Sequence, residues 1–198
     1  MGERIAVAAD TNSGITAEEA KAWGVTLIPM PFFIDGKVYY EGRTLTQADF
    51  YRHLEQNTEI STSQPAPGEV IETWEGLLKH YDRVIYIPMS SGLSSSAASA
   101  RLLAEDFDGK VLVVDNKRIS ATQRQAVLDA LYFVKQGLAA EKIRDILEQT
   151  GLDASIFITV DTLKYLQKGG RITPAAAAVG SVLNIKPVLQ IQGDKLDA

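Results

Sequence analysis

The chain has 198 residues, 45% of them apolar and 23% charged, with a mean hydropathy of −0.03, a composition typical of globular proteins that excludes intrinsic disorder. Its net charge of −5 disfavours a nucleic-acid partner, and the absence of cysteine excludes disulfides, thiolate metal sites and a cysteine nucleophile. No apolar run approaches the roughly 20 residues that span a bilayer, and the first residues do not resemble a signal peptide, so we expect a cytoplasmic protein with no membrane span.

The first part of the chain is predicted to alternate strands with helices. Thr16 with Glu19, and Thr46 with Asp49, form capping-box patterns that each open a helix, and Asp35-Gly36 is a strong hairpin signal. The expected elements are, in chain order, a strand over 5–9, a helix over 16–24, a strand over 25–30, hairpin strands over 32–34 and 37–40, and a helix from 46 to about 56.

The proline-containing stretch 61–68 is predicted to be a loop, because each proline removes a backbone donor and pushes the preceding residue out of the helical region. Apolar periodicity indicates the elements that follow. They are a helix carrying Val70 to Leu78, a strand over 83–88, a loop over 89–94, a helix entry over 95–103, a strand over 111–114, helices over 120–135 and 140–149, a strand over 155–160, a short helix over 163–167 and a last strand over 185–191.

This alternation predicts an α/β fold with a parallel sheet flanked by helices on both faces. The character of the sequence changes near Gly151, which suggests a domain over 1–150 followed by a second region over 151–198. Ligands of such sheets bind at the carboxyl ends of the strands. Those ends carry Asp10-Thr11, the serine loop Met89 to Ser94, Asp115-Asn116 and Asp161-Thr162.

The serine loop is the main candidate for chemistry, because Ser90, Ser91 and Ser94 gather where a strand leads into a helix. Helix N-terminal amides and hydroxyls together favour a bound carboxylate or phosphate. The alternative is that one serine caps the helix and the others are simply small. Isolated aspartates such as Asp10, Asp115 and Asp161 can hold a hard cation, but at strand ends they more often cap the next helix.

Two other functions use the same loop. A serine esterase or acyltransferase requires a base, which only His53 or His80 provides, and the nucleophile-elbow pattern is broken because Ser96 replaces its closing glycine. A phosphate or nucleotide binder is the other alternative, although the chain has neither a lysine-containing phosphate loop nor a dinucleotide-binding glycine motif.

Five segments in order resemble the DegV family of bacterial fatty-acid-binding proteins. They are Asp10-Thr11, Thr62 to Pro65, Ser90 to Ser94, Leu163 to Ile172 and Ile185 to Leu189. The resemblance covers nearly the whole chain. It implies a DegV-like α/β domain plus the beginning of a second α/β domain, incomplete at its C-terminus because members of the family continue beyond Ala198, with the Thr62 loop at the domain interface.

The resemblance also implies a function without catalysis. DegV proteins hold a long-chain, palmitate-like fatty acid and present its carboxylate to a fatty acid kinase. By this resemblance Thr62 and Ser91 hold the carboxylate, with Ser63, Ser90 and Ser94 as neighbours, and Arg171 lies at the pocket mouth or contacts the partner. No metal or other cofactor is implied. Where the family usually continues Ser-Gly-Thr, this chain has Ser94-Ser95-Ser96, which keeps hydroxyl donors at the helix entry.

The acyl tail would lie on apolar side chains. The expected lining is Ile28, Phe32, Phe33, Leu163, Val179, Val182 and Leu183. Each of these residues, taken alone, is more typical of an ordinary core position.

Overall fold

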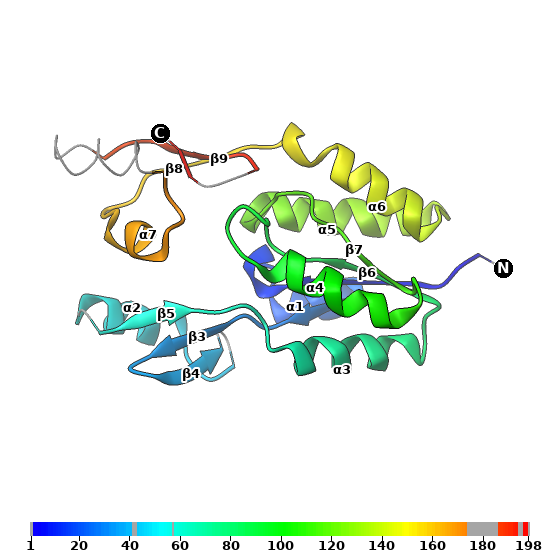
Figure 1. The fold of residues 1–198 in the computed structure, drawn as a ribbon, viewed down its shortest axis with the longest axis horizontal. Coiled ribbons are helices and arrows are strands. Elements are labelled where there is room, and N and C mark those ends of the chain that lie inside the picture. The colour runs from blue at the N-terminus through cyan, green and yellow to red at the C-terminus, as the bar shows by residue number, and fades with distance from the viewer. Residues whose placement is uncertain (1, 41–42, 57, 174–185, 194–195, 198) are drawn as a thin grey trace.

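The computed structural model describes residues 2–40, 43–56, 58–173, 186–193 and 196–197 (Figure 1). The helices are α1 Ala17–Trp23, α2 Gln47–Glu55, α3 Pro67–Leu78, α4 Ser96–Ala104, α5 Ser120–Lys135, α6 Ala140–Gln149 and α7 Lys164–Gly169, with short 3-10 turns η1 Thr11–Ser13, η2 Glu105–Phe107 and η3 Gly151–Asp153. The strands are β1 Ile5–Asp10, β2 Val25–Ile28, β3 Pro31–Ile34, β4 Lys37–Tyr40, β5 Ile60–Thr62, β6 Arg83–Ile87, β7 Val111–Val113, β8 Ile156–Ile158 and β9 Leu189–Ile191.

A four-stranded parallel sheet in the order β2-β1-β6-β7 forms the centre of the molecule and confirms the predicted α/β class. Alternate residues of β1 face opposite sides. Ile5, Val7 and Ala9 pack with residues of α1, α5 and α6, while Ala6 and Ala8 pack with residues of α3 and α4. Helices therefore cover both faces, and the strands are apolar on both sides as parallel strands require.

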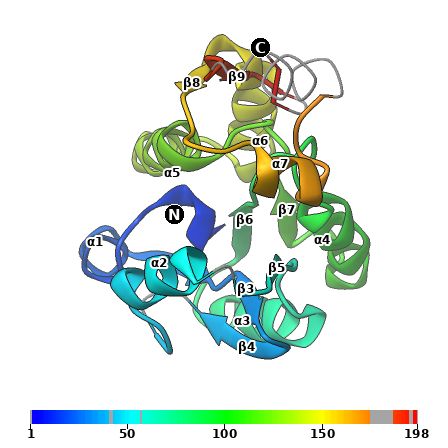
Figure 2. The same ribbon diagram turned by 90° about the vertical axis from the view of Figure 1, so that its left-hand side faces the viewer.

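Two smaller antiparallel sheets extend this core. The β3–β4 hairpin turns at Asp35-Gly36, where both residues have positive φ, and β5 pairs with the other edge of β3. Strands β8 and β9 form a separate two-stranded sheet. Figure 1 shows α2, β5 and α7 at one end of the molecule and the N-terminus at the other, and Figure 2 views the molecule from the end with α2 and α7.

The expected loop over 61–68 needs correction at both ends. Ser61 and Thr62 belong to β5, where Thr62 pairs with Phe32, and Pro67 is the first residue of α3. Proline fits this first helical position because the missing N–H has no partner within the helix. Only the middle of the stretch, which contains Pro65, is irregular.

The chain leaves the parallel sheet after α6, at the position of the predicted change near Gly151. Besides the apolar clusters on the two faces of the parallel sheet, a third apolar cluster joins the regions 1–150 and 151–198. In it, Leu93 of the serine loop packs with Ile172, Leu189 and Leu196. The division into domains over 1–150 and 151–198 stays a prediction. Among the described residues, no helix has both the length and the apolar character needed to cross a membrane.

Candidate functional site

A cavity of about 870 Å³ opens at the carboxyl ends of β1 and β6, within the size range of ligand sites. Polar lining comes from Thr62, Ser63 and Gln64, from Ser94 and Ser95 of the serine loop and α4 cap, from Thr11 and Asn12, and from Ser120 and Arg171. Apolar lining comes from Met30, Pro31, Phe32, Leu45, Phe50, Tyr51, Met89, Leu93, Ile119, Ile158, Tyr165, Leu166, Ile191 and Leu196. The cavity therefore offers a cluster of hydroxyls beside an extensive apolar wall.

Three of the expected carboxylate ligands line this cavity. Thr62 and Ser63 lie at the end of β5, are exposed, and make no side-chain hydrogen bond to any other described residue. Ser94 lies between the serine loop and α4, where its Oγ is 2.7 Å from Ser96 Oγ and accepts the backbone N–H of Ser96 at 3.1 Å. When the Ser96 hydroxyl donates to Ser94, the Ser94 proton is free for a ligand.

The other two serines lie outside the lining. Ser90 is fully buried, and its hydroxyl donates to the carbonyl of Gly193 at 2.7 Å and accepts the N–H of Gly92 at 3.1 Å. The backbone N–H of Ser91 donates to Asp115 Oδ1 at 3.2 Å. Ser90 therefore anchors the loop to the β9 region. Ser94 is among the described lining residues and Ser91 is not, and the expected role of Ser91 at the carboxylate stays a prediction.

The amides of the serine loop are satisfied inside the protein. Leu93 and Ser94 donate their N–H groups to the carbonyl of Ser90, at 3.0 and 3.1 Å. The turn therefore uses the N–H groups of Gly92, Leu93 and Ser94 for its own hydrogen bonds.

Arg171 brings a cation to the cavity. The side chain is half-buried, its Nε donates to the carbonyl of Leu93 at 3.2 Å, and its Nη1 donates to the carbonyl of Gly169. No carboxylate of the described residues forms an ion pair with it. A Cβ at Gly169 would lie 3.2 Å from Arg171 Cδ, so the glycine leaves room for the arginine to fold back onto the loop.

The apolar expectations are met only in part. Phe32 lines the cavity, with its ring 5.3 Å from that of Phe50 in an edge contact. Ile28 is fully buried in the core beneath α3, and Leu163 packs in the third apolar cluster. Phe33 is not in the lining. Val179, Val182 and Leu183 lie outside the described residues.

The histidine base that a serine esterase would need is not among the described residues of the cavity wall. Neither His53 nor His80 is among its described lining residues, so no imidazole lies there beside a serine. No group of three or more acidic or histidine side chains in the described part of the chain is arranged to hold a metal ion.

Sequence reasoning on the site missed several lining residues. Met30 and Met89 follow strand ends, and Phe50 and Tyr51 lie on α2. Only the placement of Met89 after a predicted strand gave a signal. The contribution of α2 depends on how that helix folds back over β3, which no local pattern encodes.

The model of the family described as "Uncharacterised protein, DegV family" matches residues 4–198. The chain belongs to the DegV family. A DegV domain-containing protein of Deinococcus radiodurans is 36% identical over 195 residues, which are 98% of this chain and 69% of the relative. One from Listeria innocua is 34% identical, with 99% and 70% covered.

Solved DegV structures have the same fold. The fatty-acid-binding DegV family protein of Thermus thermophilus superposes with a TM-score of 0.89 at 29% identity, and the fatty acid binding protein DegV of Bacillus subtilis with 0.86 at 31%. Each comparison covers 98% of this chain and 70% of the other. A stearic-acid-binding protein of Eubacterium ventriosum superposes with a TM-score of 0.85 at 26% identity, covering 96% of this chain and 68% of the other.

Proposed function

We propose that this DegV protein is a carrier that binds a long-chain, palmitate-like fatty acid in the cavity and does not itself catalyse a reaction. The observation that carries the proposal is that the hydroxyls of Thr62, Ser63 and Ser94 and the guanidinium of Arg171 line one cavity together with an apolar wall. The fatty-acid-binding relatives of Thermus thermophilus and Bacillus subtilis support the same ligand class.

The carboxylate binds to hydroxyl donors and to a cation. Thr62 and Ser94 donate to its oxygens, Ser63 assists, and Arg171 supplies the charge. Ser90 supports the loop in this proposal, because its hydroxyl is bonded to the carbonyl of Gly193. Ser91 is not among the described lining residues, so the proposal does not assign it to the carboxylate. A charged acceptor makes each of these hydrogen bonds stronger than a neutral pair would be.

The acyl tail supplies most of the affinity. A tail of about 15 methylenes at about 0.8 kcal/mol each represents roughly 12 kcal/mol of transfer free energy, before the costs of association. A neutral hydrogen bond contributes only about 1 kcal/mol. The head group therefore sets which end of the ligand lies at Thr62, while the apolar wall retains the ligand.

Exposure of the head-group site fits a partner enzyme. Thr62 and Ser63 line the cavity and are exposed, so a carboxylate held there remains accessible from outside. We propose that the partner is a fatty acid kinase, which transfers the terminal phosphoryl group of ATP to a carboxylate oxygen and releases ADP. The same proposal puts the protein in the cytoplasm, where a kinase has ATP available.

Replacing two hydroxyls tests the head-group assignment. The double variant Thr62→Val with Ser94→Ala should bind palmitate about thirtyfold more weakly than the parent, because two charge-assisted hydrogen bonds of about 1 kcal/mol or more each are lost. Isothermal titration gives the affinity, and native mass spectrometry reports the lipid that co-purifies. The Ser91→Ala variant is the matched control and should bind as the parent does. Equal affinity of the double variant and the parent would refute the assignment.

A further inference from the structure

Asp10 is the last residue of β1, and its buried carboxylate is not part of the described cavity lining. The residue is 0% exposed. Its Oδ1 accepts the backbone N–H of Asn12 at 3.0 Å and Nε2 of Gln123 at 3.1 Å, and its Oδ2 accepts the backbone N–H of Met89 at 2.7 Å. All three donors are uncharged.

A carboxylate in such a place is costly for the fold. Removing an ionised group from water is unfavourable unless hydrogen bonds or a cation replace the lost solvation, and here only neutral donors do so. Burial accordingly raises the pKa of Asp10, while the hydrogen bonds from Met89, Gln123 and Asn12 oppose that rise. The bond from Asn12 is the helix-capping contact that strand-end aspartates commonly make. The contacts with Met89 and Gln123 go beyond capping and indicate a further role.

The three donors belong to three separate segments at one end of the sheet. Asn12 is in η1, Met89 begins the serine loop and Gln123 is in the first turn of α5. Asn12 and Met89 both line the cavity, and Asn12 Nδ2 lies 3.1 Å from the sulfur of Met89. Gln123 also donates to the carbonyl of Ile87 at 3.0 Å, close to the start of the same loop.

We propose that Asp10 is a positioning residue for the fatty acid site: its carboxylate holds η1 and the start of the serine loop together and thereby sets where Ser94 presents its hydroxyl. The inference rests on the proposed function. Ser94 follows Met89 by five residues, and the N–H groups of Leu93 and Ser94 close the turn onto the carbonyl of Ser90, which directly follows Met89. A displacement at Met89 is therefore expected to reach Ser94. An uncharged amide in place of the carboxylate cannot accept from donors on both sides.

The Asp10→Asn variant tests the proposal. Its amide nitrogen faces one of the present donors, and we expect its dissociation constant for the fluorescent probe 11-(dansylamino)undecanoic acid to rise about tenfold, the equivalent of one unmet buried hydrogen bond. Val84→Ala is the control. It removes buried apolar volume from β6 of the same sheet, and Val84 does not line the cavity. It should lower the thermal midpoint and leave the dissociation constant of the folded protein unchanged.

Amide signals of the ligand-free parent provide a second readout. In ¹⁵N-labelled protein the N–H signals of Asn12, Met89 and Ser94 should shift together as Asp10 titrates, and Asp10→Asn should abolish that shift. Tyr86 of β6 has a pKa well above its ordinary range, and Glu19 of α1, with a pKa of about 2, pairs with Arg124 of α5. The carboxylate of Asp115 accepts the N–H of Ser91 on the same loop, so Asp115→Asn is the control, in which the shared shift should persist.

The outcomes separate this inference from the proposed function. If the parent does not bind the probe, the fatty acid proposal fails. If the parent binds and Asp10→Asn binds equally well, the positioning role is wrong. Should Asp10→Asn not fold, the titration of the parent decides. A Ser94 signal that does not follow the transition of Asn12 and Met89 would overturn the inference, and a Ser94 signal that follows it supports the inference.

Discussion

At the scale of single residues, position 151 requires glycine because the backbone of Asn116 lies very close to it. A Cβ at this position would overlap the carbonyl oxygen of Asn116 and lie 3.2 Å from its Cα. We expect Gly151→Ala to lower the free energy of unfolding by about 2 kcal/mol, because the neighbouring backbone must shift to make room. Urea denaturation measures this change.

Gly76→Ala is the matched control. Gly76 lies inside α3, and a Cβ there would meet nothing within 4 Å. Alanine should stabilise the protein by about 0.5 to 1 kcal/mol, since it restricts the unfolded chain and suits a helix interior. Equal changes at the two glycines would contradict the packing argument for Gly151.

Two ion pairs predict how stability depends on pH. Arg124 holds the pKa of Glu19 down to about 2, and Arg4 does the same for Asp82. Because these folded-state pKa values lie below the ordinary ones, the stabilisation is complete above the unfolded pKa, near pH 4 to 4.5, and is lost as the pH falls to about 2. Urea midpoints of the parent should fall over this window, and those of Arg124→Gln should fall less. Parallel curves would show that the Glu19 pair does not contribute.

At the scale of elements, α2 forms one wall of the cavity. Thr46 caps the helix by accepting the N–H of Asp49 at 3.1 Å, and Phe50 places its ring edge against Phe32 of β3. A local signal thus starts the helix, and one aromatic contact joins it to the hairpin sheet.

Phe50→Ala should weaken the binding of palmitate about tenfold, because roughly 1.5 kcal/mol or more of apolar contact with the tail is lost. The control is Tyr132→Ala, which removes an aromatic ring that is 59% exposed on α5 and does not line the cavity. Isothermal titration distinguishes the two variants. An unchanged affinity in Phe50→Ala would mean that the tail does not lie against α2.

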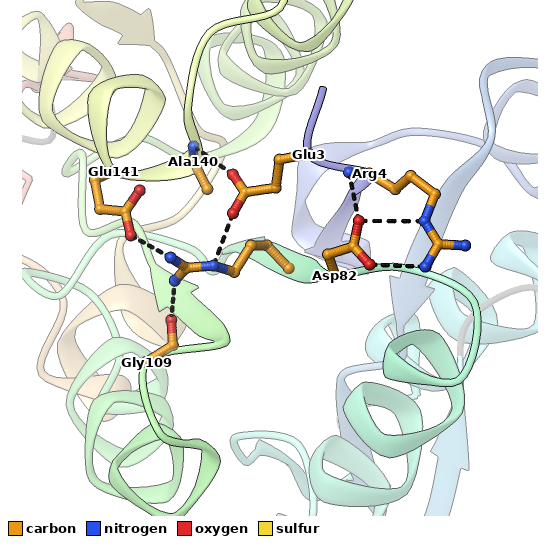
Figure 3. Close-up of polar contacts among 7 residues, drawn as sticks. Glu3, Arg4, Asp82, Gly109, Ala140 and Glu141 are labelled. Carbon is orange, nitrogen blue, oxygen red and sulfur yellow. Dashed lines mark hydrogen bonds and ion pairs between the residues drawn. The ribbon is translucent and has the colours of Figure 1, made fainter. Parts of the chain in front are cut away.

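At the scale of the whole molecule, the two ends of the parallel strands have different contacts. The carboxyl ends of the strands border the cavity, whereas charged side chains cover their amino ends (Figure 3). Arg83 pairs with Glu3 at 2.9 Å and with Glu141 at 2.7 Å, and it also donates to the carbonyl of Gly109. Glu3 in turn accepts the N–H of Ala140 at the start of α6.

This separation predicts that stability and binding can be changed independently. Arg83→Met removes two partly exposed ion pairs and should lower the free energy of unfolding by about 1 kcal/mol. The affinity for palmitate should remain that of the parent, because the cavity lies at the opposite ends of the strands. Denaturation and titration on the same sample check both halves. A loss of affinity in folded Arg83→Met would show that the ion pairs at the amino ends of the strands affect the cavity at their carboxyl ends.

The sequence by itself determined the elements whose signals are local. The capping box of Thr16 and Glu19 and the Asp35-Gly36 turn follow from interactions among residues a few positions apart. The bounds expected for α5 and α6 from apolar periodicity also agree with the structure. The ordered motifs also indicated the DegV family, to which the chain belongs.

Only the tertiary structure decided which hydroxyls reach the cavity. Ser90 is bonded to Gly193, 103 positions away, and Thr62 is placed by pairing of β5 with β3. Arg171 turns toward the serine loop through a bond to Leu93, 78 positions earlier. The serines share one residue type and one loop, so their different roles depend on contacts between distant segments, and these form only when the chain is folded.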